Sequence, residues 1–277
     1  MDASVIDYGP CFSPDGLSVL FSRRAEGSTA SHLFTVPSKG GQAINLVKSG
    51  TAVSATRASW SPRNNLIAFT GISPDDKYTT WLVNPDGTSP RQLNVAGVSD
   101  RVYYPSWYPD GVGLAVLDAG ERVIKKVNRE TLTAVTLTDP KEVFTGMPSV
   151  SPDGKWIAFA GQKNVGQRYD ETKNSIWLLS EDRHVRPLEP SQPQGRTPSW
   201  SPDGNWLAFE SNRGSDDPLL YAAFIIARDG TGLRQITSYD LNANHPVWAP
   251  DGRRLVFSAR HTKGSNRTGI AIVDLPR

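Results

Sequence analysis

The sequence predicts an all-β fold, a six-bladed β-propeller with four antiparallel strands in each blade. Three observations predict it. A seven-residue turn motif recurs six times, its copies are nearly evenly spaced, and each is followed by apolar residues that alternate with period two. No window of a dozen residues carries the 3.6-residue apolar period of an amphipathic helix, so we expect few helices.

The recurring motif has the form Pro-Ser-Trp-Ser-Pro-Asp-Gly, and its second proline marks each copy. These prolines are Pro14, Pro62, Pro109, Pro152, Pro202 and Pro250. The intervals between them are 48, 47, 43, 50 and 48 residues, so six copies fill nearly the whole chain of 277 residues. A period of this length, with several short strands in each copy, is typical of propeller blades, in which each sheet covers the apolar face of its neighbour.

The elements of a copy follow in a fixed order. The first strand carries a tryptophan in four copies, which we expect to pack between blades: Trp60, Trp107, Trp200 and Trp248. The Pro-Asp-Gly segment then forms a tight turn, so we expect its aspartates to be structural. The second strand alternates apolar residues up to one shared position, occupied by Phe21, Phe69, Val116, Phe159, Phe209 and Phe257. A third strand, such as Ile176–Leu179, and a short fourth strand, such as Arg234–Thr237, complete the blade.

The two ends of the chain suggest how the ring closes. Copy six ends in its third strand, Ile270–Val273, and is followed by no fourth strand. The segment Ala3–Asp7 precedes the first motif and has no other assignment. We therefore expect Ala3–Asp7 to pair with Ile270–Val273 as the outer strand of blade six, which would remove two free sheet edges. The whole chain, residues 1–277, is then expected to form one propeller domain.

The repeated motif resembles the TolB-like propeller repeat. Copy five is most similar, with Pro198–Gly204, then Phe209-Glu210-Ser211-Asn212-Arg213-Gly214, then Gly230 and Arg234-Gln235-Ile236-Thr237. TolB itself carries an α/β domain before its propeller, and we expect this chain to hold the propeller alone. The resemblance implies a bacterial periplasmic or cell-envelope location. Similar propellers occur in prolyl-oligopeptidase-type peptidases and in oligogalacturonate lyases, so the fold by itself leaves the function open.

Composition excludes several classes of partner. The formal net charge is only +2, which gives no support to a nucleic-acid partner. No apolar run approaches the roughly 18 residues that a membrane-spanning helix needs. The first ten residues lack the basic and apolar regions of a signal peptide. A single cysteine, Cys11, excludes an intrachain disulfide and a cysteine-rich zinc site.

The residues just before each first strand are the candidate binding site, because blade geometry brings them to one mouth of the central channel. The candidates are Tyr8, Arg57, Tyr103, Tyr104, Arg196 and His245. Arginines offer forked donors to carboxylate or phosphate groups, and tyrosines offer flat surfaces to sugars or side chains. We therefore expect a non-catalytic, monomeric binding module that takes a protein, a peptide or a carbohydrate ligand at the channel mouth, with no cofactor and no metal.

An enzyme that processes polysaccharide or peptide in the channel is the alternative. Arg57, Tyr104, Arg196 and His245 are the one plausible channel cluster for it. The chain has no Gly-x-Ser-x-Gly elbow of a serine hydrolase. Only His245, among four histidines, stands directly before a first strand, whereas a lyase-type metal site requires several converging histidines.

Overall fold

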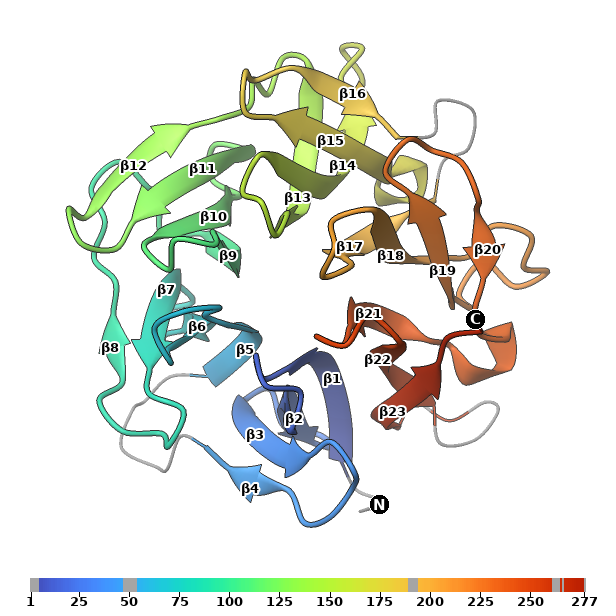
Figure 1. Ribbon diagram of the computed structural model, residues 1–277. Coiled ribbons are helices and arrows are strands. Elements are labelled where there is room, and N and C mark those ends of the chain that lie inside the picture. The colour runs from blue at the N-terminus through green and yellow to red at the C-terminus, as the bar shows by residue number, and fades with distance from the viewer. Residues whose placement is uncertain (1–4, 47–53, 189–193, 261–264, 266, 277) are drawn as a thin grey trace.

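Six antiparallel sheets stand around a central channel in the computed structural model (Figure 1), which describes residues 5–46, 54–188, 194–260, 265 and 267–276. The six-bladed propeller predicted from the repeats is confirmed. Five sheets have four strands, and the sheet of blade six has three strands in the described part of the chain.

The blades follow one another in chain order. Blade one contains β1 (Val5–Phe12), β2 (Ser18–Ala25), β3 (Ser31–Pro37) and β4 (Ile44–Asn45). Blade two contains β5 (Ser54–Trp60), β6 (Ile67–Ile72), β7 (Tyr78–Val83) and β8 (Arg91–Gln92). Blade three contains β9 (Val102–Trp107), β10 (Gly113–Asp118), β11 (Val123–Asn128) and β12 (Thr133–Thr136).

The second half of the ring repeats this arrangement. Blade four contains β13 (Val143–Val150), β14 (Trp156–Lys163), β15 (Ser175–Ser180) and β16 (Val185–Pro187). Blade five contains β17 (Arg196–Trp200), β18 (Trp206–Ser211), β19 (Ala222–Ala227) and β20 (Arg234–Gln235). Blade six contains β21 (Asn244–Trp248), β22 (Arg254–Arg260) and β23 (Thr268–Asp274). The helices of the described residues are two single 3₁₀ turns, η1 (Glu171–Lys173) and η2 (Tyr239–Leu241).

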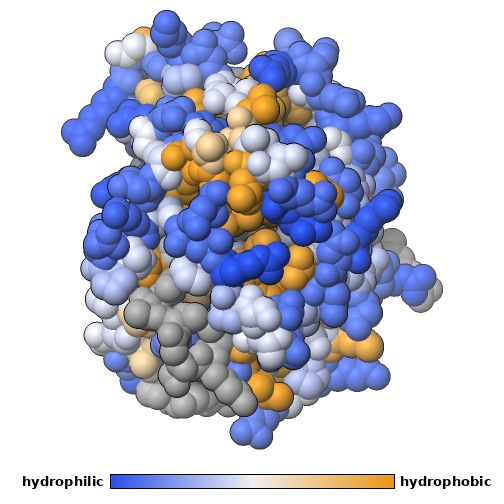
Figure 2. All heavy atoms as spheres, turned by 90° about the vertical axis from the view of Figure 1, so that its left-hand side faces the viewer, coloured by the Kyte–Doolittle hydropathy of each residue, from blue (hydrophilic) through white to orange (hydrophobic). Residues whose placement is uncertain are grey.

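The core lies in the seams between neighbouring sheets, as the alternating pattern predicts. The shared apolar position of the second strands is at most 2% exposed in all six blades. The tryptophans of the first strands also join blades: Trp107 donates from Nε1 to the Ser59 carbonyl at 3.0 Å, and Trp200 donates to the Ser149 carbonyl at 3.0 Å. Each of these bonds connects the first strands of two adjacent blades. The outer face over β8 and β12 is largely polar, with smaller apolar patches between the polar side chains (Figure 2).

The Pro-Asp-Gly turns are structural, as expected. Asp15 Oδ1 accepts hydrogen bonds from the Leu17 amide at 2.9 Å and from the Ser13 hydroxyl at 2.5 Å. These bonds, led by the one from Ser13, lower the pKa of Asp15. Gly16 has φ +72°, a backbone conformation that glycine adopts without steric cost.

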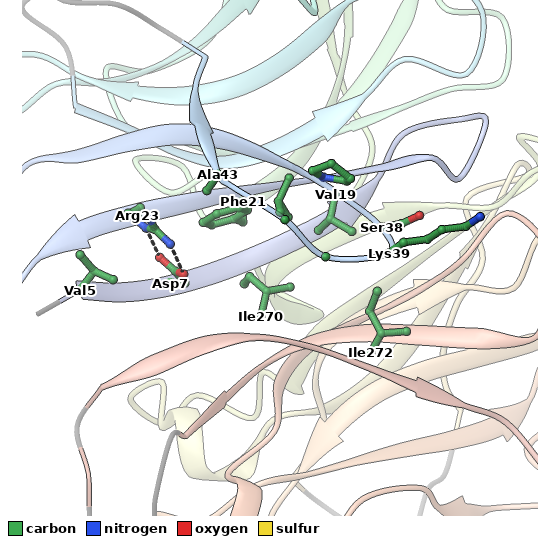
Figure 3. Close-up of a pocket in the computed structure, with 14 residues that line it drawn as sticks. Val5, Asp7, Val19, Phe21, Arg23, Ser38, Lys39, Ala43, Ile270 and Ile272 are labelled. Atoms are coloured by element: carbon green, nitrogen blue, oxygen red, sulfur yellow. Dashed lines mark hydrogen bonds and ion pairs between the residues drawn. The ribbon is translucent and has the colours of Figure 1, made fainter. Parts of the chain in front are cut away.

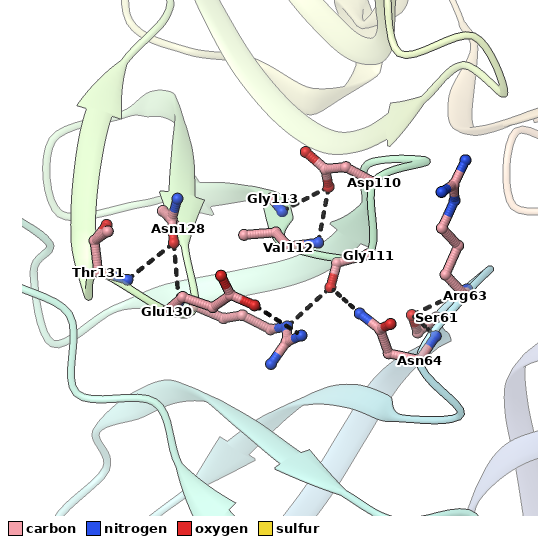
Figure 4. A network of polar contacts seen from close by, with 11 residues as sticks. Ser61, Arg63, Asn64, Asp110, Gly111, Val112, Gly113, Asn128, Glu130 and Thr131 are labelled. Atoms are coloured by element: carbon pink, nitrogen blue, oxygen red, sulfur yellow. Dashed lines mark hydrogen bonds and ion pairs between the residues drawn. The ribbon is translucent and has the colours of Figure 1, made fainter.

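Copy two departs from the turn motif, and this departure connects blades two and three (Figure 4). Arg63 and Asn64 stand where most copies have aspartate and glycine, and Asn64 Nδ2 donates to the Gly111 carbonyl at 2.7 Å. Arg129 donates from Nε to the same carbonyl at 2.8 Å. Next to it, Asp110 Oδ1 accepts from the amides of Val112 and Gly113, both at 2.8 Å. The changed turn therefore replaces local turn chemistry with a contact between blades.

The predicted ring closure is wrong for the residues that can be tested. Val5–Asp7 does not pair with β23 but extends β1, where Val5 opposes Ala25 and Asp7 opposes Arg23 of β2. The physical reason is the buried Asp7 carboxylate, which forms a bidentate ion pair with Arg23 at 2.7 and 2.8 Å and so fixes this register. Ala3 and Ser4 lie outside the described residues. Within the described chain, β23 is the outermost strand of blade six.

Candidate binding site at the channel mouth

The first strand of every blade, which is the inner strand, carries one bulge, and the bulges place six residues at equivalent positions around the ring. In each blade the register between the first and second strands shifts near the middle of the first strand. One residue at each shift has a left-handed backbone with φ between +50° and +59°: Gly9, Arg57, Tyr104, Met147, Thr197 and His245. Such conformations are costly for residues other than glycine, about 1–3 kcal/mol each, and they cluster at functional sites.

These six residues line the channel, which holds a cavity of about 190 Å³. In five blades the next residue is a proline: Pro10, Pro105, Pro148, Pro198 and Pro246. The inner strands present free edges to the channel, and a proline has no amide hydrogen to offer to another strand. The prolines therefore keep these edges from pairing, so that side chains, rather than backbone amides, dominate the chemistry of the mouth.

Arg57 is the centre of the site. Its guanidinium lies 4.9 Å from the ring centre of Tyr104 and 5.9 Å from that of Tyr8, within cation–π range. It also donates a hydrogen bond to Nε2 of His245. These contacts join residues of blades one, two, three and six. No carboxylate of the described residues forms an ion pair with Arg57, so no acidic neighbour among them balances its charge.

His245 is neutral at physiological pH. Burial, Arg57 and Arg196 together lower the pKa of His245 well below 6.5. Because a guanidinium can only donate, Nε2 must accept, and the imidazole proton is therefore on Nδ1. Nδ1 is buried and has no hydrogen-bond partner among the described residues. The imidazole of His245 thus keeps one buried, unsatisfied donor beside a permanent cation.

Glu210 is a site residue that the sequence analysis missed. It lies on β18, is 2% exposed, and its carboxylate forms an ion pair with Arg196 Nε at 3.1 Å. Its other oxygen accepts from the His245 amide at 2.6 Å. The guanidinium of Arg196 also lies 4.1 Å from the ring centre of Tyr221. The charge of Arg196, unlike that of Arg57, is therefore balanced within the protein.

A signal for Glu210 was present in the sequence. It follows the shared apolar position of the second strand, where the other blades have Ser22, Thr70, Leu117, Ala160 and Ser258. In blade two Thr70 Oγ1 accepts from the amide of Tyr104 at 3.2 Å, just as Glu210 accepts from the amide of His245. This position therefore supports the bulge residue of the following blade, and only in blade five is it charged.

The structure separates the six predicted residues into two groups. Arg57, Tyr104 and His245 line the channel. Tyr8, Tyr103 and Arg196 each precede the channel position of their blade by one residue. The Tyr8 hydroxyl bonds Ser31 Oγ at 2.5 Å, and the Tyr103 ring packs on Tyr78 with centres 4.6 Å apart. The inner group lines the channel, where a ligand would contact it. The outer group lies beside the inner group and supports it: Tyr8 lies near Arg57, and Tyr103 lies near Tyr104.

The family can now be assigned. Residues 73–276 match the family model described as the TolB beta propeller domain. The chain belongs to this family. The solved structures that share the fold of this TolB propeller include a TolB candidate from Agrobacterium tumefaciens, with a TM-score of 0.71 and 21% identity over 98% of this chain and 91% of that chain. An oligogalacturonate lyase from Vibrio parahaemolyticus has a TM-score of 0.59 and 15% identity, covering 98% of this chain and 91% of that one.

One curated relative is similar in sequence. The uncharacterized peptidase YuxL of Bacillus subtilis (strain 168) is 28% identical over 176 residues, which cover 61% of the TolB propeller chain and 24% of the relative. The match thus spans about a quarter of the length of that peptidase. Within the described residues, no group of three or more His, Cys, Asp or Glu is arranged to hold a metal ion. None of the helices described is long and apolar enough to cross a membrane.

Proposed function

We propose that this TolB propeller is a non-catalytic binding module that holds an anionic group of a peptide, protein or glycan ligand at the channel mouth. One observation carries the proposal. The guanidinium of Arg57 stands at the mouth without a carboxylate partner among the described residues, between the ring of Tyr104 and the neutral imidazole of His245.

The surroundings of Arg57 favour a carboxylate ligand. Because His245 is neutral, it adds no second positive charge beside Arg57. The Tyr104 ring supplies a flat apolar surface beside the cation, suited to a sugar ring or an aliphatic side chain. A guanidinium binds a carboxylate through two parallel hydrogen bonds, and such charge-assisted bonds are roughly twice as strong as neutral ones. The ligand therefore combines a carboxylate with a flat or aliphatic part.

Matched ligand pairs test this function. Oligogalacturonate and its methyl ester differ mainly in charge, as do an acidic peptide and its amidated form. We expect isothermal titration to detect binding of the charged member of at least one pair and much weaker binding of its neutral partner. Arg57→Ala should weaken that binding about tenfold or more, the equivalent of about 1.4 kcal/mol.

Arg254→Ala is the matched control, because Arg254 lies at the opposite end of its blade in an ion pair with Asp251 at 2.7 Å. It should leave affinity unchanged. Arg196→Ala should weaken binding less than Arg57→Ala, since the charge of Arg196 is already balanced by Glu210. Equal affinity of the charged and neutral ligands, or an unaffected Arg57→Ala variant, would contradict the proposed site.

A second candidate is an enzyme that processes peptide or polysaccharide in the channel. The neutral His245 favours it, because an imidazole whose Nε2 is released by Arg57 can accept a proton from a substrate. The similarity to part of a peptidase agrees with it. Incubation with the same ligands, followed by mass spectrometry, distinguishes the two. Product that accumulates with the wild type and not with His245→Ala would replace the binding module by the enzyme.

A further inference from the structure

A second cavity lies away from the channel, in the seam between blades six and one. It measures about 600 Å³. Val19, Phe21, Ile270 and Ile272 form its apolar lining, and Lys39 lies at its rim (Figure 3). The outer wall is the free edge of β23, which is the outermost described strand of blade six.

In the other five blades the same position is filled. Directly after the fourth strand, or at its end, one leucine or isoleucine donates its amide to a carbonyl of the third strand. The five bonds run from Leu46 to Leu33, Leu93 to Thr80, Leu137 to Ile124, Leu188 to Ile176 and Ile236 to Ala223, and each is 2.8 or 2.9 Å long. The side chain enters the seam; Leu46, for example, packs in one cluster with Ile67, Phe69 and Val83 of the next blade.

Equivalent residues identify the cavity as the sixth of these leucine sites. Val19, Phe21 and Val36 of blade one line the cavity, and they correspond to Ile67, Phe69 and Val83 of blade two. Ile270 corresponds to Leu33, because both oppose the residue that follows the buried phenylalanine of the second strand, Ser258 and Ser22. The Ile270 carbonyl is therefore the acceptor that a sixth leucine would use.

No described residue of this chain reaches the site by the usual connection. In the five complete blades the apolar residue precedes the left-handed residue of the next inner strand by 11, 11, 10, 9 and 9 positions. In blade one the left-handed residue is Gly9, and the described chain begins only four positions earlier, at Val5. Val5 itself belongs to β1 and opposes Ala25.

We propose that the seam between blades six and one is a docking site for an extended segment of a partner polypeptide, which adds to β23 as an antiparallel fourth strand. The five internal copies define its chemistry. A leucine or isoleucine fills the cavity and donates its amide to Ile270. A threonine follows it, since Thr138 and Thr237 accept from the amides of Ile124 and Ala223, both at 2.9 Å, in the corresponding places.

Charge sets one further position of the partner strand. In blades four and five the residue two places before the buried one is an arginine that stacks on a tryptophan: Arg186 on Trp156 at 6.0 Å and Arg234 on Trp206 at 5.0 Å. Blade six has Arg254 in place of that tryptophan. Arg254 pairs with Asp251 at 2.7 Å, and a second arginine would add a like charge beside this ion pair, so an acidic residue is favoured over an arginine at this position of the partner strand. Main-chain pairing then supplies affinity, and the two side chains supply specificity.

A peptide built from the protein's own blade five tests the proposal. The probe is the fluorescein-labelled peptide of residues 231–238 with Glu in place of Arg234, and the control peptide carries Asp in place of Ile236 as well. Fluorescence anisotropy should show saturable binding of the probe to the whole chain and at least about tenfold weaker binding of the control. Amide hydrogen exchange should slow along β23 when the probe is bound.

A surface variant places the peptide on the molecule. Ile272 is 37% exposed in the cavity wall, and Ile272→Asp should abolish binding. Val135→Asp, a matched change at a 50% exposed position of β12, should not. Circular dichroism confirms that both variants are folded, and hydrogen exchange with the wild type tests the site without any variant.

Three results would overturn the proposal. No binding of the probe would show that the edge of β23 takes no strand. Binding only after deletion of residues 1–4 would assign the site to the protein's own N-terminal segment. A dimer in light scattering that the probe dissociates would assign it to a second copy of this chain. Binding to the monomeric whole chain with the expected side-chain dependence supports a partner strand. The experiment involves neither Arg57 nor the channel, so its result is independent of the proposed function.

Discussion

Replacement of Trp200 by alanine measures how much the seams between blades contribute to stability. Trp200 lies on β17, is 6% exposed, and packs in one cluster with Ile176 and Leu178 of blade four. Its Nε1 donates to the Ser149 carbonyl, which also belongs to blade four. Truncation of a buried aromatic side chain costs about 3–5 kcal/mol, and we expect the upper part of this range because the Ser149 carbonyl also loses its donor.

Urea denaturation followed by both fluorescence and circular dichroism provides the measurement. Coincident transitions by the two probes are required, because a repeat protein can unfold in parts. Trp200→Phe keeps most of the ring and removes the donor, so it should cost about 1–2 kcal/mol and separate the hydrogen bond from the packing. Trp60→Ala is the second comparison, because Trp60 is only partly buried and its Nε1 has no partner among the described residues. A loss below about 1 kcal/mol for Trp200→Ala would refute the assignment of this residue to the core.

Three further predictions concern the site and the single thiol. The pKa of His245 is lowered in the folded chain, so below pH 6.5 the unfolded chain binds a proton that the folded chain does not. The contribution of His245 to the free energy of unfolding should therefore be constant above this pH and decline below it. Urea titrations of His245→Gln should show a shallower decline. Glu210→Gln should lose about 1.5–3 kcal/mol by weakening the bonds to Arg196 and to the His245 amide, and thermal melts of Glu210→Thr, which copies blade two, report whether a neutral acceptor suffices. Burial raises the pKa of Cys11 to about 12, so a thiol reagent at pH 8 should modify the protein only in denaturant, and rapid labelling of the native chain would contradict the structure.

The repeats made the fold predictable, because each blade repeats the same sequence pattern. Six copies of one turn, one buried position and one strand alternation predict the number of blades and the inward-facing residues. The candidate site was predictable to within one residue for the same reason. Periodicity indicates which positions share a level of the ring, and Arg57, Tyr104 and His245 do line the channel.

Local geometry is what periodicity does not predict. A bulge inserts one residue into each inner strand and moves Arg57 toward the channel while Tyr8 and Arg196 stay beside it, and single-residue shifts of this kind reverse the direction of a side chain. The Val5–Asp7 error has a different origin. The sequence analysis assigned this segment to blade six because it lies outside the repeated motif. The ion pair between Asp7 and Arg23, which fixes the segment in blade one, depends on the register of β1 and β2 and is not visible in the repeats.

Departures from the internal symmetry mark the places where this molecule differs from a propeller of six equivalent blades. Equivalent positions in the six blades have equivalent surroundings, so the fold does not require a residue that differs in one blade from its counterparts. Glu210 is the one charged residue at the position that supports the bulge residues, and it serves the blade that carries His245. Among the described residues, the seam beside β23 is the one seam whose leucine site is not filled. The first departure balances the charge beside the channel mouth, and the second exposes a strand edge with an apolar cavity behind it. A stable ring needs neither departure, and the two stand at the two places where we propose that this propeller binds a ligand or a partner strand.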